Sequence, residues 1–237
     1  SKMQLFYNSE INETTKQIVF DKIESRHIVK VLRKKEGDIL KITNGKDFLF
    51  DAKITIASDK KCIVEIISAT QKPKPWPYYL HIAIAPTKNN DRTEWFLEKA
   101  TEIGIDEITP LICSNSERRV VKLERFEKII QSAMKQSLKF TLPKLNNPIK
   151  FNDFIQQDFE GLKCIAHCEE HEKNLLKNVI KTEQKITILI GPEGDFSLGE
   201  IKKALEKNYT PISLGESRLR TETAALVAVN TVSLMQE

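Results

Sequence analysis

The chain has 237 residues, and its 40% hydrophobic and 30% charged residues, with a net charge of +4, are ordinary for a soluble globular protein. No apolar run approaches the roughly 20 residues that span a bilayer, and the start of the chain lacks a signal-peptide core, which argues against a membrane protein. The four cysteines lie mostly in apolar, strand-like stretches, so we expect reduced thiols in the cytoplasm and no disulfide framework.

The first 72 residues are predicted to form a small β-barrel-like domain. Strands are expected at 38–42, 47–56 and 61–67. Asn44-Gly45 favours a turn between the first two strands, and the one helical candidate is 25–32, where apolar residues share a face. Residues 71–79 hold three prolines and predict a stiff connector, which we expect Trp76 to anchor. We therefore place a domain boundary after residue 72.

From residue 73 onward, strands alternate with helices. The expected strands are 80–85, 108–113, 163–168, 186–190 and 212–214. The expected helices are 92–103 with Gly104 as its C-cap, a basic helix at 124–140, one starting at Ser197 with Glu200 as capping-box partner, and one from about Thr221 to the C-terminus. Trp95 is expected in the core. Because these strands are apolar throughout, they indicate a parallel sheet with helices on both faces.

Basic residues concentrate in two regions. Residues 1–72 hold 14 Lys and Arg against 10 Asp and Glu (+4), and 118–150 hold 9 against 2 (+7), whereas 73–117 and 151–237 carry −3 and −4. Clustered Lys and Arg attract phosphate backbones, but such a run is also found on an ordinary solvated face. Charge alone therefore leaves nucleic-acid binding open.

Two glycine-containing loops each follow a predicted strand and open a predicted helix. The first contains Gly191-Pro192-Glu193-Gly194, and the second runs from Leu214-Gly215 to Thr221. Glycines at such a junction let backbone N–H groups approach a ligand, although neither spacing fits a dinucleotide fingerprint or a P-loop. An ordinary strand–helix turn explains the first loop alone. In the second loop, Thr221 as the helix cap and Glu222 beside the helix dipole explain part of the pattern, but not a basic, glycine-containing loop at the end of a second parallel strand. Because ligands bind beyond the carboxyl ends of parallel strands, the two loops together predict one shared pocket.

A zinc site is a tempting but disfavoured interpretation of Cys164, His167, Cys168 and His171. On a strand, Cys164 and Cys168 share one face while His167 points to the other, and no second ligand pair lies elsewhere. We therefore expect no metal.

The two loops also carry a family resemblance. Gly191-Pro192-Glu193-Gly194 and Leu219-Arg220-Thr221-Glu222-Thr223-Ala224 resemble the hallmark of the RsmE family, SPOUT-superfamily methyltransferases that modify N3 of a uridine in small-subunit (16S) ribosomal RNA. Further matches follow in the family's order at 27–33, at 99–105, and at Gln136-Ser137 with Pro143. The chain departs from the family pattern at Lys135 and Lys139, which flank Gln-Ser, and at Asp195, where a second glycine is frequent.

The resemblance implies an α/β fold with two domains. Residues 1–72 would form a PUA-like RNA-binding β-barrel, and 73–237 a SPOUT methyltransferase domain with a C-terminal trefoil knot within about 163–237. It further implies a homodimer, S-adenosyl-L-methionine as cofactor, and 16S rRNA within the small ribosomal subunit as substrate.

The resemblance also assigns candidate site residues. Cofactor contacts are expected from His167, Ile190, Gly191, Pro192, Glu193, Gly194, Leu214, Gly215, Leu219, Arg220, Thr221, Thr223 and Ala224. Arg220 would hold the target phosphate or the developing negative carbonyl oxygen, and Glu222 or Glu193 would remove the N3 proton. The ordinary interpretations are a surface salt bridge from Arg220 to Glu216 or Glu222, and helix-start carboxylates for the two glutamates.

RNA docking is assigned to a set of basic residues whose sum should make binding steeply salt-dependent. They are Arg26, Arg33, Lys34, Lys88, Arg92, Arg118, Arg119, Lys122, Arg125, Lys135 and Lys139. A target base within folded RNA would be extruded to reach the cofactor. Two rival functions stay open at this point, namely a non-catalytic RNA-binding or ribosome-assembly factor, and an enzyme that uses the glycine loop for a nucleotide or phosphate.

Overall fold

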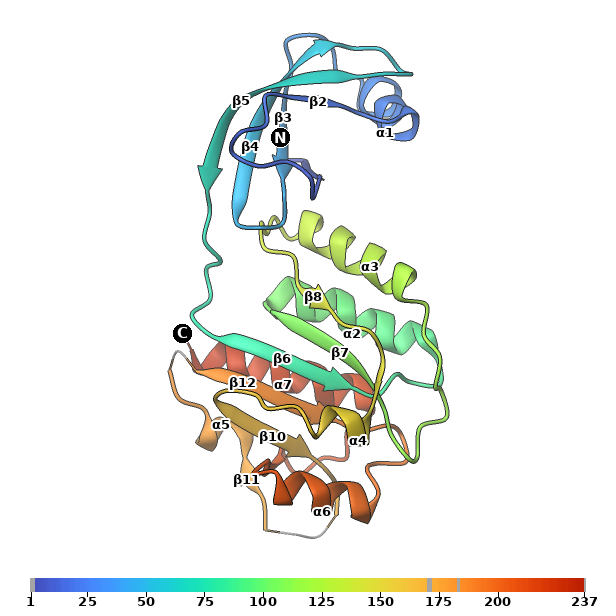
Figure 1. The fold of residues 1–237 in the computed structure, drawn as a ribbon, viewed down its shortest axis with the longest axis vertical. Helices are drawn as coiled ribbons and strands as arrows, with labels where there is room; N and C mark the ends of the chain where they lie inside the picture. Colours follow the sequence, from blue (N-terminus) through green and yellow to red (C-terminus); the bar gives the residue numbers. More distant parts are fainter. Residues whose placement is uncertain (1–2, 170–171, 183, 237) are drawn as a thin grey trace. The chain divides into compact units, whose positions relative to one another are not determined.

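The computed structural model describes residues 3–169, 172–182 and 184–236 (Figure 1). The chain divides into two compact units. One comprises Ser1–Lys74 with Met134–Leu142, and the other comprises Pro75–Ala133 with Pro143–Glu237. The segment 134–142 thus groups with residues that lie far from it in the sequence. Within the first unit, the N–H of Leu142 donates to the carbonyl of Gly45 at 2.9 Å.

The N-terminal unit is built on a five-stranded sheet in the order β1-β3-β4-β5-β2. The three predicted strands are present as β3 (Ile39–Thr43), β4 (Phe48–Ile56) and β5 (Ile63–Gln71), paired antiparallel in chain order. Two further strands, β1 (Leu5–Tyr7) and β2 (Gln17–Val19), escape prediction because three residues are too few to show an alternation. Alternate side chains of these strands, among them Phe6, Ile42 and Phe50, form the core of the unit.

The predicted helix at 25–32 is present but begins three residues earlier. It consists of α1 (Lys22–Arg26), continued by a π-helical turn, η1 (His27–Val31). Asp21 caps α1, because its carboxylate accepts the Glu24 N–H at 2.7 Å. Arg33 follows the π-turn in the left-handed region, with a φ of 55°. Such turns are often found at functional sites, and this one lies in the segment that resembles the family's N-terminal motif.

The second unit contains the predicted parallel sheet. Its strand order is β11-β13-β10-β12-β6-β7-β8, with β9 also paired to β7. The strands are β6 (Tyr79–Ile84), β7 (Glu107–Ile112), β8 (Lys144–Leu145), β9 (Ile149–Lys150), β10 (Leu162–Ala166), β11 (Asn174–Leu175), β12 (Lys185–Ile190) and β13 (Thr210–Ser213). Every pair in this sheet is parallel. The carboxyl ends of its strands therefore meet at one edge.

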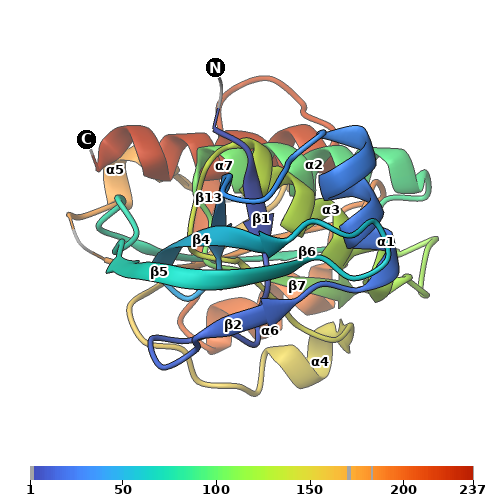
Figure 2. The ribbon, with the colours of Figure 1, turned by 90° about the horizontal axis from the view of Figure 1, so that it is seen from above.

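Helices cover both faces of this sheet, as predicted. The helices of this unit are α2 (Asn90–Ile103), α3 (Leu123–Gln136, whose last residues group with the first unit), α4 (Phe151–Phe154), α5 (Leu176–Val179), α6 (Leu198–Glu206) and α7 (Thr221–Met235). Figure 2 shows α2 and α7 on one side of β6 and β7, and α4 and α6 on the other. Ala83 and Ala85 pack against Phe154 and Ile201 on the α4–α6 side, so the alternate residues of β6 face α2 and α7.

Several local predictions can be compared with the structure. The Ser197–Glu200 capping box and the Gly104 C-cap, with a φ of 135°, are confirmed. Trp76 is buried and anchors the connector through its Nε1–H to the Asp106 carboxylate at 3.1 Å. The prediction that Trp95 lies in the core is wrong, because its side chain is 40% exposed.

Helix α3 stops at Gln136 and not at 140, because Leu138 adopts the left-handed region with a φ of 53°. Among the described residues, no helix is long and apolar enough to cross a bilayer. The trefoil knot stays a prediction.

Candidate active site

A pocket of about 780 Å³ lies at the carboxyl edge of the parallel sheet. Its walls are the loops that follow β10, β12 and β13, together with the start of α7 and Arg92 from α2. The two glycine-containing loops thus share one pocket, as their positions after parallel strands predict. The volume falls within the roughly 300–1,000 Å³ of small-molecule sites.

The loop after β12 folds back on itself in a tight turn. The Asp195 N–H donates to the Pro192 carbonyl at 2.9 Å, and Asp195 has a φ of 63°. Asp is one of the few residues that tolerate this left-handed conformation, so Asp195 adopts the backbone that the family's glycine would supply. Its carboxylate accepts the N–H of Cys168 at 3.0 Å. The substitution therefore leaves the turn intact and ties it to the loop after β10.

The loop after β13 is joined to the same turn by Thr221. The Thr221 hydroxyl is buried and donates to the Gly191 carbonyl at 2.9 Å. Thr221 is therefore not the helix cap. That position belongs to Arg220, whose side chain makes no capping bond. The hydrogen bond fixes the two halves of the pocket to each other.

The two carboxylates predicted as bases lie in different environments. Glu193 is exposed, and its Oε1 accepts the backbone N–H of Lys88 at 2.8 Å, which holds the loop between β6 and α2. Glu222 is 7% exposed, lines the pocket, and pairs its Oε1 with Nη1 of Arg92 at 3.6 Å. Among the described ion pairs, Glu222 is bound to Arg92 and not to Arg220. Arg220 itself is exposed at the pocket wall.

A third loop, after β7, fastens these elements from outside the pocket. The Asn115 amide donates to the carbonyls of Gly194 and Asp195 at 3.2 and 3.1 Å. The Arg118 guanidinium donates to the carbonyls of Thr87 and Lys88 at 3.2 and 2.8 Å. Arg118 therefore positions a loop of the site, a role that its charge alone does not reveal.

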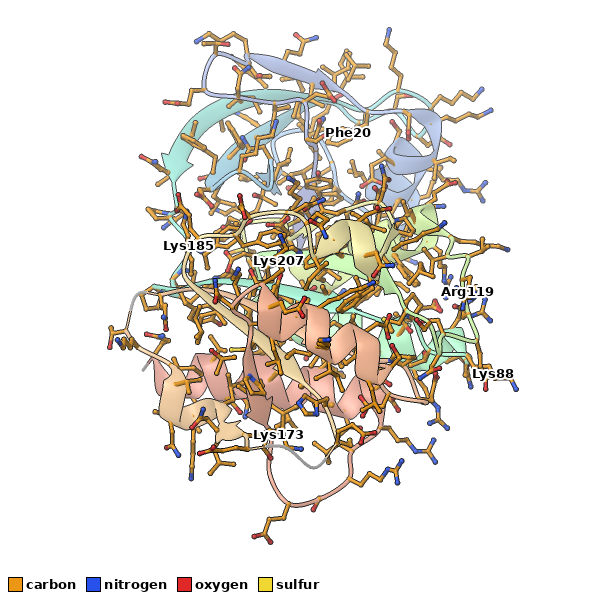
Figure 3. The ribbon with its side chains drawn as sticks, turned by 60° about the horizontal axis from the view of Figure 1, so that its bottom comes forward. Phe20, Lys88, Arg119, Lys173, Lys185 and Lys207 are labelled. Carbon is orange, nitrogen blue, oxygen red and sulfur yellow. The ribbon has the colours of Figure 1, made fainter. Side chains whose placement is uncertain are left out.

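The predicted RNA-binding residues are divided between the two units. Arg26, Arg33, Lys34, Lys135 and Lys139 belong to the first unit, and Lys88, Arg92, Arg118, Arg119, Lys122 and Arg125 to the second. Figure 3 shows the side chains of Lys88 and Arg119 extending outward from the same side of the second unit. Arg125 is exposed but pairs with Glu94 at 2.6 Å. The set therefore comprises two separate groups of basic residues, one on each unit.

The pocket wall contains almost every residue predicted to contact the cofactor. Thr223 is the exception, because it does not line the pocket. The prediction missed Arg92 as a pocket residue, and also the loop after β10, apart from His167. Lys173 in that loop donates to the carbonyls of His167 and Glu169 at 3.0 and 2.9 Å. The pairing of β10 between β12 and β13 is the signal that places this loop in the pocket.

The cysteines near the pocket lie in unlike surroundings. Strand β10 ends at Ala166, so the predicted strand face shared by Cys164 and Cys168 is wrong. Cys164 lies in the core, where burial raises the pKa of its thiol to about 12, whereas Cys168 is exposed. His171 lies outside the described residues. Within the part of the chain that is described, no group of His, Cys, Asp and Glu side chains is arranged to hold a metal ion.

Known proteins match this chain over nearly its whole length. The RNA methyltransferase domain family matches residues 74–233, and the RNA methyltransferase PUA domain family matches residues 20–67. The ribosomal RNA small subunit methyltransferase E of Buchnera aphidicola subsp. Acyrthosiphon pisum is 33% identical over 228 residues, which cover 92% of this chain and 88% of that protein. This chain belongs to the ribosomal RNA small subunit methyltransferase E family. The RsmE resemblance is therefore confirmed.

Solved structures agree with the family assignment. A probable rRNA-methyltransferase from Porphyromonas gingivalis superposes with a TM-score of 0.92 at 42% identity, covering 99% of this chain and 98% of its own. A ribosomal RNA small subunit methyltransferase E from Neisseria gonorrhoeae, bound to S-adenosyl methionine, superposes with a TM-score of 0.85 at 26% identity, covering 99% and 98%. The PUA domain and the methyltransferase fold of this family member are thus confirmed, and the chain is an RNA methyltransferase.

Proposed function

We propose that this enzyme transfers a methyl group from S-adenosyl-L-methionine to N3 of one uridine in 16S rRNA within the small ribosomal subunit. The observation that carries the proposal is the single pocket formed by the loops after β12 and β13. A family member from Neisseria gonorrhoeae is bound to S-adenosyl methionine, which supports the choice of donor. A cytoplasmic location follows from the proposed substrate, since ribosomal subunits are assembled there.

The pocket residues fit the parts of this donor. Ile190, Ile212 and Leu214 line the pocket and would give apolar walls to a flat adenine ring, and backbone N–H and C=O groups of the adjoining loops would be available to its edges. Four basic and five acidic side chains also line the pocket, so it can match a ligand with a carboxylate, an ammonium and a sulfonium. Those side chains are Arg92, Lys173, Arg218, Arg220, Glu169, Glu193, Asp195, Glu216 and Glu222. We propose that the predicted pocket residues hold the donor in this way.

The chemistry that the chain must supply is mainly alignment. When bound, the donor provides an activated methyl group, so holding the uridine N3 in line with it accounts for much of the rate. The N3 proton must also leave, and negative charge develops on the neighbouring carbonyl oxygens. Glu222 is buried in the pocket wall and is better placed to accept the N3 proton than Glu193, whose carboxylate already accepts the backbone N–H of Lys88. Exposed Arg220 is suited to the target phosphate.

Two groups of basic residues support RNA docking. We propose that the first 72 residues act as a PUA-like RNA-binding barrel and that 73–237 form the SPOUT methyltransferase domain. Exposed Arg26 and Arg33 would serve the barrel, and Lys88, Arg119 and Lys122 the rim of the second unit. Because each phosphate contact releases counterions, the affinity should fall steeply with salt.

A homodimer is supported by the composition of α7. Residues 223–236 contain no charged side chain, yet Leu234 is 59% exposed and Val227 is only partly buried. A solvated helix face is normally polar, so an uncharged one indicates a protein partner. Light scattering should show a dimer for the wild type and a monomer for Leu234→Glu. A monomeric wild type at micromolar concentration would contradict the homodimer.

The direct test uses labelled donor and small ribosomal subunits from cells that lack this gene. Digestion of the RNA should yield labelled 3-methyluridine at a single position. If no label enters the RNA although the protein binds the donor, this RNA is not the substrate. Absence of both binding and transfer would favour a non-catalytic RNA-binding factor.

A further inference from the structure

The basic residues of the pocket differ in how they are held. Lys173 donates to backbone carbonyls of its own loop, and Arg218 and Arg220 are exposed. Arg92 comes from a different element, the first turn of α2, and forms an ion pair with a buried carboxylate in the first turn of α7. Among the described residues of the pocket wall, Arg92 and Glu222 thus form an ion pair inside the site.

A buried carboxylate beside a guanidinium is an expensive arrangement. The desolvation of the carboxylate offsets much of its attraction to the guanidinium, so such a pair adds little to stability. The side chain of Glu222 is 10% exposed and that of Arg92 40%, and the 3.6 Å separation of Oε1 and Nη1 is longer than a hydrogen bond. The guanidinium has five N–H donors, and the carboxylate can accept several hydrogen bonds. The pair therefore presents a donor and an acceptor side by side to a ligand.

The imide edge of uridine has the complementary arrangement. Its N3–H is a donor, and the carbonyl oxygens on either side are acceptors. Cytidine lacks the N3 proton and carries an amino group in place of one carbonyl, so it would set donor against donor at the same position.

We propose that Arg92 and Glu222 together read this imide edge and act as catalytic residues, with Glu222 accepting the N3 proton and Arg92 holding the adjacent carbonyl oxygen. This inference rests on the function proposed above. The N3–H bond breaks and its proton passes to a Glu222 carboxylate oxygen. The freed electron pair of N3 forms the new bond to the methyl carbon. The pair of the carbon–sulfur bond stays on sulfur, which loses its positive charge. Arg92 stabilises the negative charge on the carbonyl oxygen while N3 is ionised.

The test compares single-turnover methylation by wild type, Arg92→Ala, Glu222→Gln and Glu193→Gln. Glu222→Gln should lose about 10²- to 10⁴-fold in rate, and Arg92→Ala about 10²- to 10³-fold, with little change in RNA affinity. Both losses should shrink as the pH rises, because more of the bound uridine ionises without help. Glu193→Gln is the comparison variant, because Glu193 is the other carboxylate predicted as a base. It removes a carboxylate that holds a loop, so its rate should keep the wild-type pH dependence.

A second substrate makes the test specific for proton removal. RNA with 5-fluorouridine at the target position has a more acidic N3 proton, so it should restore Arg92→Ala and Glu222→Gln more than it accelerates wild type or Glu193→Gln. Donor binding and thermal melting report whether each variant is folded. If Arg92→Ala or Glu222→Gln does not fold, Arg92→Lys or Glu222→Asp takes its place. Each of these conservative variants should lose less activity than Arg92→Ala or Glu222→Gln does.

Three outcomes would overturn the inference. An Arg92→Ala variant that changes only RNA affinity would make Arg92 a docking residue. An equal response of all variants to 5-fluorouridine would place both residues outside the proton transfer. Absence of methylation by wild type would refute the proposed function itself. This outcome is distinguished from failure of the inference because it is measured on the wild type alone, without any variant.

Discussion

Replacing Thr221 with valine should separate the two loops that form the pocket. Valine has nearly the shape of threonine, so Thr221→Val removes the hydroxyl and leaves the packing almost unchanged. The lost hydrogen bond, 2.9 Å long, leaves the buried Gly191 carbonyl without this donor. An unsatisfied buried carbonyl costs about 1–3 kcal/mol. If the contact between the two loops opens, this cost appears as weaker binding of S-adenosyl-L-methionine, by about 5- to 150-fold.

Titration calorimetry with S-adenosyl-L-methionine measures the loss of affinity, and urea unfolding of the full chain measures the loss of stability. If the contact between the two loops stays closed in the variant, the same 1–3 kcal/mol appears as lost stability, so the two losses should sum to that range. Thr221→Ser keeps the hydroxyl and removes one methyl group, worth about 0.8 kcal/mol, so it should bind the donor as wild type does. A Thr221→Val variant with wild-type stability and wild-type affinity would refute the idea that this hydroxyl joins the loops.

Two further perturbations test the sheet that carries the site. At Gly161, with a φ of 84°, an added Cβ would lie 2.1 Å from the Lys185 carbonyl oxygen, so Gly161→Ala should destabilise the protein by about 2–5 kcal/mol in urea unfolding. Gly37→Ala, where a Cβ meets nothing within 4 Å, should cost only about 1–2 kcal/mol, and equal losses would contradict the clash. Burial lowers the pKa of His81 below its usual value of 6.5 despite the nearby Glu107. The folded protein therefore favours the neutral imidazole, and protonation of His81 destabilises the fold. Stability should therefore fall as the pH drops below about 6.5, and it should fall less in His81→Asn. If the urea unfolding midpoint changes with pH in the same way in both proteins, His81 makes no such contribution.

The architecture of the second unit was accessible from sequence because its signals are local. Continuous apolar runs such as 186–190 predict buried parallel strands, and Ser197 followed by Glu200 marks a helix start. Both are present in the structure. The same rule on strand ends brought the two glycine-containing loops to one pocket, and the structure places both in its wall.

What the sequence did not reveal depends on contacts between distant residues. The loop after β10 reaches the pocket because β10 lies between β12 and β13, an order that no local pattern records. Residues 134–142 group with the first unit through backbone bonds such as that from Asp47 N–H to the Phe140 carbonyl at 3.0 Å. In the sequence Arg92 is one more basic residue at a helix start, because Glu222, its partner, lies 130 positions further along the chain.

The hydrogen bonds around the pocket explain how loops can serve a reaction that depends on alignment. Thr221 joins the loops after β12 and β13, Asp195 joins the loop after β12 to that after β10, and Glu193 holds the loop before α2. Each of these hydrogen bonds runs from a side chain to a backbone group, so it fixes the position of a main chain rather than one side chain. Small misplacements are costly when two reactants must be held in line. The pocket walls are therefore held by contacts within the protein itself, and Arg92 and Glu222 are the charged groups that we propose act on the base.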